Sequence, residues 1–216
     1  MMVDNQRFKD VLLSLGAAMS HGVPTGLHRI QLQKFIYLQD VLITAWREVA
    51  KPSAFVPWNR GPYDRQIQNA VDALAFRGFV EVSNLVFRGT RNASSTYRLS
   101  SDGRNALGSI RKDITIEVEF ALAEEIAREI ERRGWSDIVD LVYAEPTYVS
   151  ARNRDDARSL RTSDPNENIT TQIIRAFQRA WTEGPTQQVS PDCFVQIAFL
   201  VLDEYRHSNK REKLDK

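Results

Sequence analysis

Apolar residues recur at helical spacing over the first fifty positions of the chain. The first stripe consists of Phe8, Val11, Leu12 and Leu15. This spacing predicts a helix of about four turns, which Gly16 together with the glycine-containing cluster over residues 22–26 ends. A broader apolar stripe between residues 27 and 49 predicts a second helix, which we expect to be central to the core.

The segment 58–100 has the order of elements found in a winged helix. A Gly-Pro pair at positions 61 and 62 marks a turn that leads into an amphipathic helix, predicted over residues 62–77. Ile67, Val71 and Leu74 share the apolar face of this helix. Gly78 is predicted to end it, because glycine readily takes the left-handed conformation that follows many helices.

Two β-rich runs follow the amphipathic helix, at residues 79–87 and 96–99. The polar and basic run 88–95 between them predicts a hairpin with an exposed tip. Residues 100–103 carry side chains suited to capping a further helix through about residue 110. We therefore expect a mainly α fold with a small antiparallel β-hairpin, organised as a winged-helix-like unit at the N-terminal end.

The second half of the chain has a mostly helical pattern. Four helices are predicted over residues 113–132, 135–144, 169–181 and 191–205. The last of these is so rich in apolar residues that we expect it to be buried almost all round. The arginine-rich segment 145–168 is predicted to be a long connection, and the charged tail 207–216 is expected to fray. The predicted domains are a winged-helix-like domain, 1–112, and a helical extension packed on it, 113–216.

Composition and charge narrow the class of protein. Apolar types make up 42% of the 216 residues, enough for a sizeable core, and no apolar run is long enough to span a membrane. We expect a cytoplasmic protein without a disulfide, since Cys193 is the single cysteine. Residues 60–112 hold 9 basic and 4 acidic residues, whereas residues 113–216 hold 14 and 20. This asymmetry is compatible with a polyanion bound to the basic segment, with complementary surfaces in a homodimer, or with ordinary solvated charge that happens to be unevenly distributed.

Four short motifs follow one another between residues 27 and 107. They are Leu32-Gln33-Lys34-Phe35-Ile36-Tyr37-Leu38, Gly61-Pro62-Tyr63-Asp64, the segment from Leu74 to Val80 with Gly78 as its break, and Tyr97-Arg98-Leu99-Ser100 ahead of Gly103. In this order they resemble the Panacea antitoxin domain (SocA-like) and the related YwgA-like winged-helix proteins. The segment from Leu141 to Tyr148 resembles the helix and proline that follow the winged unit in this family.

The resemblance implies a non-catalytic interaction module of the kind found in bacterial toxin–antitoxin loci and among accessory subunits of phage-defence systems. It therefore implies a partner protein such as a toxin, a nuclease or an ATPase subunit. The basic segment 151–161 and the helices from residue 169 onward match no part of the family, so the identity of the partner cannot be transferred.

A candidate surface for nucleic acid or a partner lies on the polar face of the predicted helix 62–77 and on the arginines around it. Its residues are Arg60, Arg65, Gln68, Asn69, Asp72, Arg88 and Arg91. Arginine suits guanine edges, asparagine and glutamine suit adenine edges, and arginines on the wing would contact phosphates. The acidic Asp72 opposes DNA binding. A solvated helix face or a protein contact are the alternatives, because a fold does not dictate a function.

Two further groups of residues are weaker candidates. Trp58, Tyr63 and Phe76 could form an aromatic pocket under the start of the helix, where free N–H groups favour an anion, although core packing explains aromatics as well. Four arginines in the connection could clamp a phosphate: Arg152, Arg154, Arg158 and Arg161. Two aspartates, at positions 155 and 156, are interleaved with them and favour local ion pairs instead.

No pattern in the chain indicates an enzyme. His21, His28 and His207 are scattered without the spacing of metal ligands, and no glycine-rich phosphate loop occurs. We therefore expect no catalysis, cofactor or metal. The sequence predicts function by protein–protein binding, with a dimeric DNA-binding regulator that uses helix 62–77 and wing 88–95 as the alternative.

Overall fold

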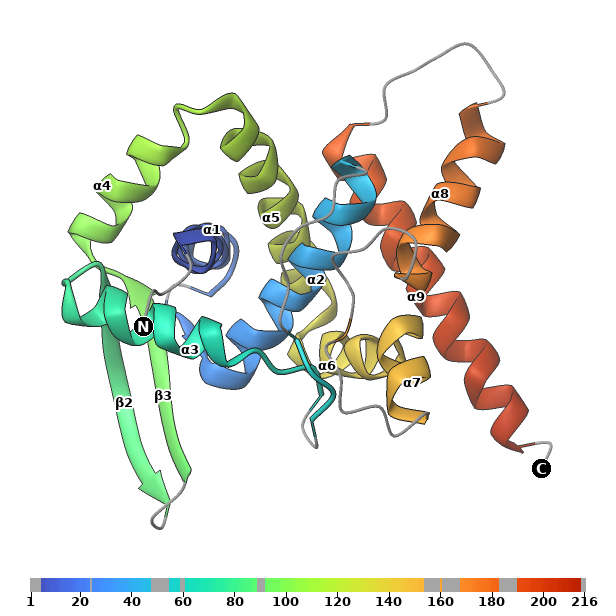
Figure 1. Ribbon diagram of the computed structural model, residues 1–216, viewed down its shortest axis with the longest axis horizontal. Coiled ribbons are helices and arrows are strands. Elements are labelled where there is room, and N and C mark those ends of the chain that lie inside the picture. Colours follow the sequence, from blue (N-terminus) through green and yellow to red (C-terminus); the bar gives the residue numbers. More distant parts are fainter. Residues whose placement is uncertain are drawn as a thin grey trace. The chain divides into compact units, whose positions relative to one another are not determined.

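The computed structural model describes residues 5–23, 25–47, 55–58, 61–88, 92–153, 160, 168–182 and 190–214 (Figure 1). Its helices are α1 (Asn5–Ser20), α2 (Arg29–Arg47), α3 (Arg65–Phe76), α4 (Ser101–Ile110), α5 (Ile114–Arg133), α6 (Trp135–Ala144), α7 (Pro146–Asn153), α8 (Ile169–Thr182) and α9 (Pro191–Leu214). Its strands are β1 (Leu27–His28), β2 (Val80–Arg88) and β3 (Asn92–Leu99), which form one antiparallel sheet. The predicted fold class, mainly α with a small antiparallel hairpin, is confirmed.

The chain divides into two compact units. The first comprises residues 1–36 and 64–132, and the second comprises residues 37–63 and 133–216. These bounds differ from the predicted division at residue 112, because α5 belongs to the first unit and the segment 37–63 to the second. None of the helices in the described ranges combines the length and the apolar character needed to cross a bilayer.

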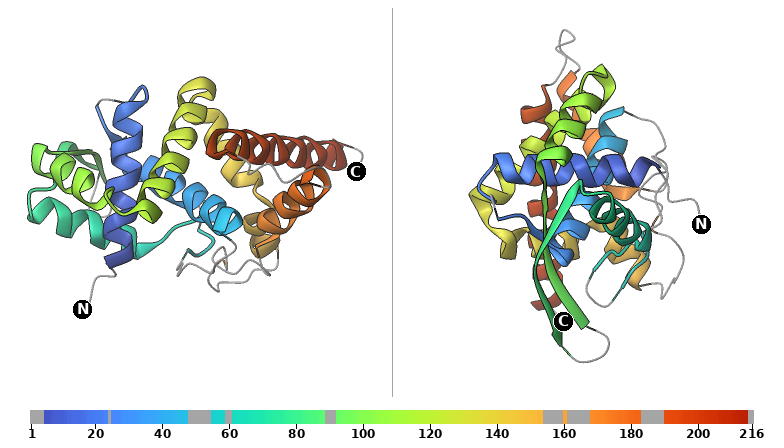
Figure 2. Two further views of the ribbon diagram at one scale, coloured as in Figure 1. Left: turned by 90° about the horizontal axis from the view of Figure 1, so that it is seen from above. Right: turned by 90° about the vertical axis from the view of Figure 1, so that its left-hand side faces the viewer.

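The first unit has the element order α1, β1, α2, α3, β2, β3, in which α3, β2 and β3 follow one another as predicted and the two-residue strand β1 was not predicted. In the sheet the strand order is β1-β3-β2, and β2 and β3 run side by side as a long hairpin (Figures 1 and 2). The register runs from Val80 opposite Leu99 to Arg88 opposite Asn92. A bulge interrupts it between Ser83 and Val86, where the backbone is left-handed.

The predicted first helix of about four turns is α1, which ends at Ser20, just before the 22–26 cluster; the expected contribution of Gly16 to this end is wrong. Gly16 serves close packing instead of termination. A Cβ atom at this position would lie 2.3 Å from the Cδ2 atom of Leu107 in α4, so a larger residue here would require the Leu107 side chain to move. The chain turns after Ser20, and Gly22 takes a φ of 70° there.

Helix α3 begins three residues later than predicted. Asp64 caps it by accepting a hydrogen bond from the backbone N–H of Gln66 at 2.8 Å, so Pro62 lies outside the helix. At the other end Gly78 takes a φ of 79°, which confirms the predicted break. The predicted cap of α4 is also confirmed, since Ser100 Oγ accepts from the N–H of Gly103 at 3.0 Å.

In the second unit, three predictions about the C-terminal half are wrong. The segment 145–168 contains a helix, α7, and α9 extends to Leu214 instead of fraying at residue 207. Helix α9 is also not buried all round. The residues at positions 192, 196, 200 and 204 form an exposed stripe with a spacing of four, and Leu200 on this stripe is 64% exposed. An apolar residue type alone therefore does not reveal which face of a helix is covered.

Candidate functional site

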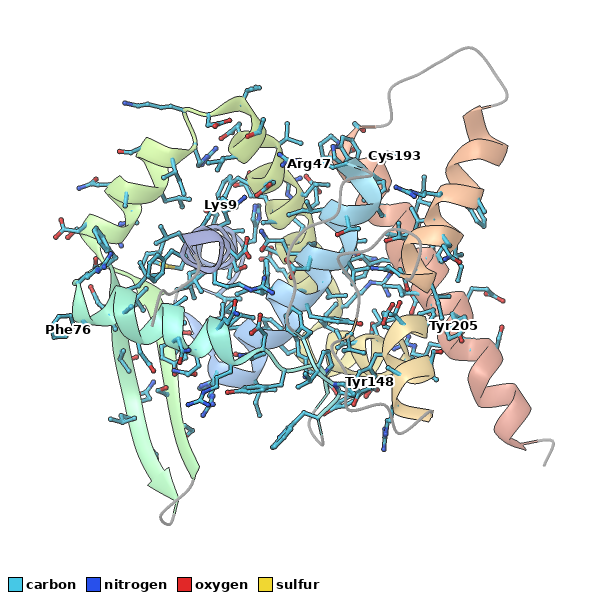
Figure 3. All side chains as sticks on the ribbon, in the orientation of Figure 1. Lys9, Arg47, Phe76, Tyr148, Cys193 and Tyr205 are labelled. Atoms are coloured by element: carbon cyan, nitrogen blue, oxygen red, sulfur yellow. The ribbon has the colours of Figure 1, made fainter. Side chains whose placement is uncertain are left out.

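The exposed face of α3 carries four residues at helical spacing. They are Arg65, Asn69, Asp72 and Phe76, and we call them the α3 stripe. Arg65 and Asp72 are exposed and Asn69 is half-buried. Phe76 is 93% exposed at the end of the helix, where Figure 3 labels it. The opposite face, with Ile67, Ala70, Val71 and Leu74, is buried in the first unit.

Gln68 lies beside the stripe and is held by neighbouring side chains. Its amide Nε2 donates to Asp72 Oδ1 at 2.8 Å and to the hydroxyl of Tyr97 at 3.2 Å. Since an amide nitrogen has two N–H donors, both are used within the unit and only Oε1 is left for an outside ligand. Reading adenine needs a donor and an acceptor together, so this arrangement suits Gln68 to positioning Asp72.

The N-terminal end of α3 is fixed by a pair of hydrogen bonds between two of the sequence motifs. Gln33 Oε1 accepts from the backbone N–H of Asp64 at 2.9 Å, and Gln33 Nε2 donates to the carbonyl of Asp64 at 2.9 Å. Both residues are buried. The motif in α2 and the Gly-Pro-Tyr-Asp motif therefore meet in space and hold the helix start in place.

A buried ion pair completes this anchor. Arg7 Nε donates to Asp64 Oδ2 at 2.9 Å and Arg7 Nη1 donates to Asp10 Oδ2 at 2.8 Å. All three side chains are at most 1% exposed. Sequence reasoning missed Arg7 and Asp10, because their spacing on α1 resembles an ordinary surface pair. Only the packing of α1 on α3 places them inside.

The hairpin adds apolar surface to the first unit. Val82 pairs with Tyr97, on the same face of the sheet, and is 46% exposed. Leu85 lies in the bulge of β2 and is 54% exposed, and Val86 is exposed as well. Since β2 is an edge of the sheet, these side chains stand beside backbone that no further strand covers among the described residues.

In the basic segment 60–112, most of the arginines whose side chains are described have contacts inside the first unit. Four of those whose side chains are described have such a contact: Arg98 with Glu81, Arg111 with Glu117, Arg104 with the carbonyl of Leu99, and Arg77 over the ring of Phe8. Arg65 of the stripe is exposed. Arg60 and Arg91 lie outside the described residues, and for Arg88 only the backbone, in β2, is described.

The predicted aromatic pocket is wrong with respect to Phe76. This residue lies at the C-terminal end of α3 and is almost fully exposed, so it is not under the helix start. Trp58 and Tyr63 do contact each other, with ring centroids 6.1 Å apart and planes tilted by 41°. Of the four arginines predicted for a phosphate clamp, Arg152 lies in α7 and the others lie outside the described residues.

In the second unit a buried carboxylate, Glu145, caps α7 and joins three helices. It accepts hydrogen bonds from the hydroxyls of Tyr37 and Thr170, both at 2.5 Å, and from the backbone N–H groups of Thr147 and Tyr148, at 3.0 and 2.7 Å. Burial, together with the charge of Glu145, raises the pKa of Tyr37 well above its ordinary value. Four donors satisfy this carboxylate, which indicates a structural role.

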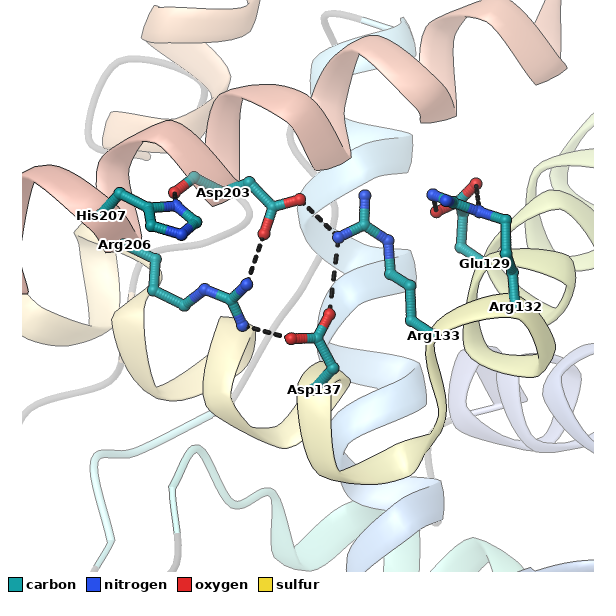
Figure 4. A network of polar contacts seen from close by, with 7 residues as sticks. All are labelled: Glu129, Arg132, Arg133, Asp137, Asp203, Arg206 and His207. Carbon is teal, nitrogen blue, oxygen red and sulfur yellow. Dashed lines mark hydrogen bonds and ion pairs between the residues drawn. The ribbon is translucent and has the colours of Figure 1, made fainter.

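A second polar cluster joins α6 to α9 (Figure 4). Arg133 and Arg206 each bind both Asp137 and Asp203, so that four side chains close a ring of ion pairs. Burial alone would raise the pKa of Asp137, but the hydrogen bond and charge of Arg206, followed by those of Arg133, lower it. Two cations and two anions balance, so the ring is suited to holding helices together and not to binding an ion.

Within the described ranges, no three His, Cys, Asp or Glu side chains gather as a metal site would require. Cys193 is a half-buried free thiol in the first turn of α9. No protein-family model matches the sequence, and no curated protein matches it either.

Proposed function

We propose that this chain is a non-catalytic, winged-helix-type interaction module that acts by protein–protein binding through the α3 stripe. The observation that carries the proposal is Phe76, a large apolar side chain that is 93% exposed on the stripe. Burying a phenylalanine side chain in an interface is worth about 1.5–3 kcal/mol. Arginine and aromatic side chains often dominate binding energies, and the stripe carries one of each.

The position of the stripe supports the proposal. In a winged helix that binds DNA, this helix would face the phosphate-rich groove. Here the centre of the stripe carries Asp72, held in place by Gln68, and its end carries Phe76. A carboxylate repels phosphates, and a bare phenyl ring gains nothing from them. Both groups suit a protein surface that offers a cation and an apolar pocket.

The exposed part of the hairpin extends the surface. Val82 and Leu85 add apolar area, and interfaces generally combine such area with polar groups at the rim. The engaged arginines Arg98 and Arg111 further support a protein partner. Their charges are compensated by Glu81 and Glu117, so they contribute little to a field that would attract nucleic acid.

The resemblance to the Panacea and YwgA-like proteins supports a biological setting for this binding. We propose that the chain is antitoxin-like, or an accessory subunit of a bacterial toxin–antitoxin or phage-defence system. Its partner would then be a toxin, a nuclease or an ATPase subunit encoded nearby. The motif residues Gln33 and Asp64 would act in this function by positioning α3, since both are buried.

The test compares matched variants of the full chain in its native host. The tagged chain should recover one partner at a stoichiometric ratio, and the double substitution Asp72→Lys with Phe76→Ser should abolish recovery. The control Phe177→Ser changes an exposed phenylalanine of the second unit and should leave recovery unchanged. Recovery that is equal for all three proteins, or a chain that recovers no stoichiometric partner, would exclude the α3 stripe as the interface.

A DNA-binding regulator is the second candidate function, supported by the winged-helix order of elements and by Arg65 and Asn69 on the stripe. It predicts binding to the protein's own promoter with an affinity that falls steeply as salt rises. Arg88→Ala combined with Arg91→Ala should reduce this salt dependence. If no binding to the promoter is detected at low salt, this alternative is refuted and the protein-binding proposal is unaffected.

A further inference from the structure

In the second unit, backbone hydrogen bonds link residues on either side of Trp58. Val56 and Tyr63 exchange two backbone hydrogen bonds, at 2.9 and 3.0 Å, and Gly61 N donates to the carbonyl of Trp58 at 2.9 Å. The same carbonyl accepts a hydrogen bond from the hydroxyl of Tyr148 at 3.1 Å. The backbone of Trp58 is thus held by two donors.

The side chain of Trp58 is nevertheless 60% exposed, and it contacts the half-buried ring of Tyr63. Tryptophan is usually mostly buried, so a tryptophan that is exposed on a fixed backbone is informative. The ring is held in place at little further entropic cost, because its backbone and one neighbour already restrict it. Such a ring is suited to stacking a flat ligand.

A cation lies on the helix that binds the backbone of Trp58 through Tyr148. Arg152 is in α7, one helical turn after Tyr148 and on the same face, and Figure 3 labels Tyr148 on that helix. Burial raises the pKa of the Tyr148 hydroxyl and the charge of Arg152 partly opposes this, so the guanidinium acts on the hydroxyl that binds Trp58. Arg152 is exposed, and no hydrogen bond or ion pair within the described ranges involves it.

We propose that Trp58, Tyr63 and Arg152 form a binding site for a nucleobase and its phosphate, with the base stacked on Trp58 and the phosphate paired with Arg152. Stacking on aromatic rings combined with a cation on the backbone is the chemistry by which proteins hold single-stranded nucleic acid. The same chemistry binds a free nucleotide. Glu145, the acid that binds the backbone N–H of Tyr148, is buried and satisfied by four hydrogen bonds, so it offers no exposed oxygen to Arg152.

This site is separate from the α3 stripe, which lies in the first unit, so either proposal can fail without the other. A proline-rich peptide is the other ligand class that uses exposed tryptophan. Such a peptide has no need of Arg152, whereas a nucleotide phosphate does. The requirement for both the ring and the cation is therefore what the experiment must establish.

The test measures binding of a fluorescently labelled ten-nucleotide DNA strand to the full chain by anisotropy at low salt, with AMP as a competitor. Trp58→Ala should weaken binding by about tenfold or more, as is typical for loss of one stacking ring. Trp58→Phe should bind nearly as well as the original chain but lose most of the quenching of tryptophan fluorescence. Arg152→Ala should weaken binding and lower the salt slope by about 0.7, the value for one phosphate contact on a single strand.

Two exposed positions elsewhere provide controls, Phe177→Ala for the aromatic and Arg128→Ala for the cation. Both should bind like the original chain. Competition by AMP would assign the site to a free nucleotide, and binding of the strand without such competition would assign it to single-stranded nucleic acid. Absence of binding to either ligand, or unchanged affinity in Trp58→Ala, would overturn the proposal. So would quenching of Trp58 by a proline-rich peptide alone.

Discussion

Replacing Asp64 by alanine should destabilise the first unit more than any substitution on its surface. The aspartate has two roles there. One oxygen caps α3 through the N–H of Gln66, and the other accepts the buried guanidinium of Arg7. Alanine removes both interactions and leaves Arg7, which is 1% exposed, with a single remaining carboxylate from Asp10 among the contacts described above.

The two losses have different magnitudes. Loss of a helix cap costs about 1 kcal/mol. Removing one partner of a buried ion pair costs about 3–5 kcal/mol, and the lower value applies because Asp10 still binds Arg7. Together they predict that Asp64→Ala lowers the free energy of unfolding by about 4 kcal/mol. For a chain of this length that corresponds to a melting temperature lower by about 10 °C.

The substitution Asp64→Asn separates the two contributions. Asparagine caps a helix as well as aspartate does but carries no charge, so it should lose only the ion pair, about 3 kcal/mol. Urea unfolding followed by circular dichroism at 222 nm measures both variants against the original chain. If Asp64→Ala costs no more than about 1 kcal/mol, the cap alone accounts for it. The buried ion pair with Arg7 would then contribute nothing, and the reasoning would be refuted.

Three further substitutions test other parts of the structure. Burial lowers the pKa of Lys34 from 10.5 to about 7. Between pH 7 and pH 10.5 the unfolded chain therefore binds more protons than the folded chain. The free energy of unfolding should rise with pH over this range, by up to about 1.4 kcal/mol per pH unit. Lys34→Met should flatten this rise in urea titrations between about pH 7 and pH 9. Asp203→Ala opens the ion-pair ring of α6 and α9 and should lower the free energy of unfolding by about 1–2 kcal/mol. Thermal unfolding should show a smaller loss at 1 M salt, because salt screens the ion pairs. Equal losses at low salt and at 1 M salt would contradict the electrostatic explanation. Gly103→Ala places a Cβ atom 2.1 Å from the carbonyl oxygen of Phe79, so it should lower the free energy of unfolding in urea by about 2 kcal/mol or more. The control Gly108→Ala, in the same helix, has open space around its Cβ atom and should leave the stability unchanged or raise it.

The secondary structure of the chain was largely predictable from sequence because its signals are local. The stripe of apolar residues in α5 and the exact extent of α6 follow from periodicity within each segment. The breaks at Gly78 and the cap at Ser100 depend on residues within a few positions of each other. A backbone conformation or a capping hydrogen bond of this kind does not need a distant partner.

The candidate surface was only partly predictable. The helical spacing predicted one polar face with Arg65, Gln68, Asn69 and Asp72. In the structure Arg65 and Asp72 are exposed, whereas Gln68 and Asn69 are half-buried. The spacing also places Phe76 on this face. Phenylalanine is usually buried, however, so Phe76 was predicted to line a pocket, whereas in the structure it is exposed.

The sequence by itself therefore determined the hairpin, every helix except α7, and their order, because each depends on neighbours within one or two turns. Only the tertiary structure shows that Gly16 packs against Leu107 within a continuous helix. Only the tertiary structure shows that Arg7 and Asp64, 57 residues apart, form a buried ion pair. It also decided that Tyr37 meets Glu145 across 108 residues. Burial and pairing between such positions depend on how elements pack against one another, and the pattern within a single element carries no information about that packing.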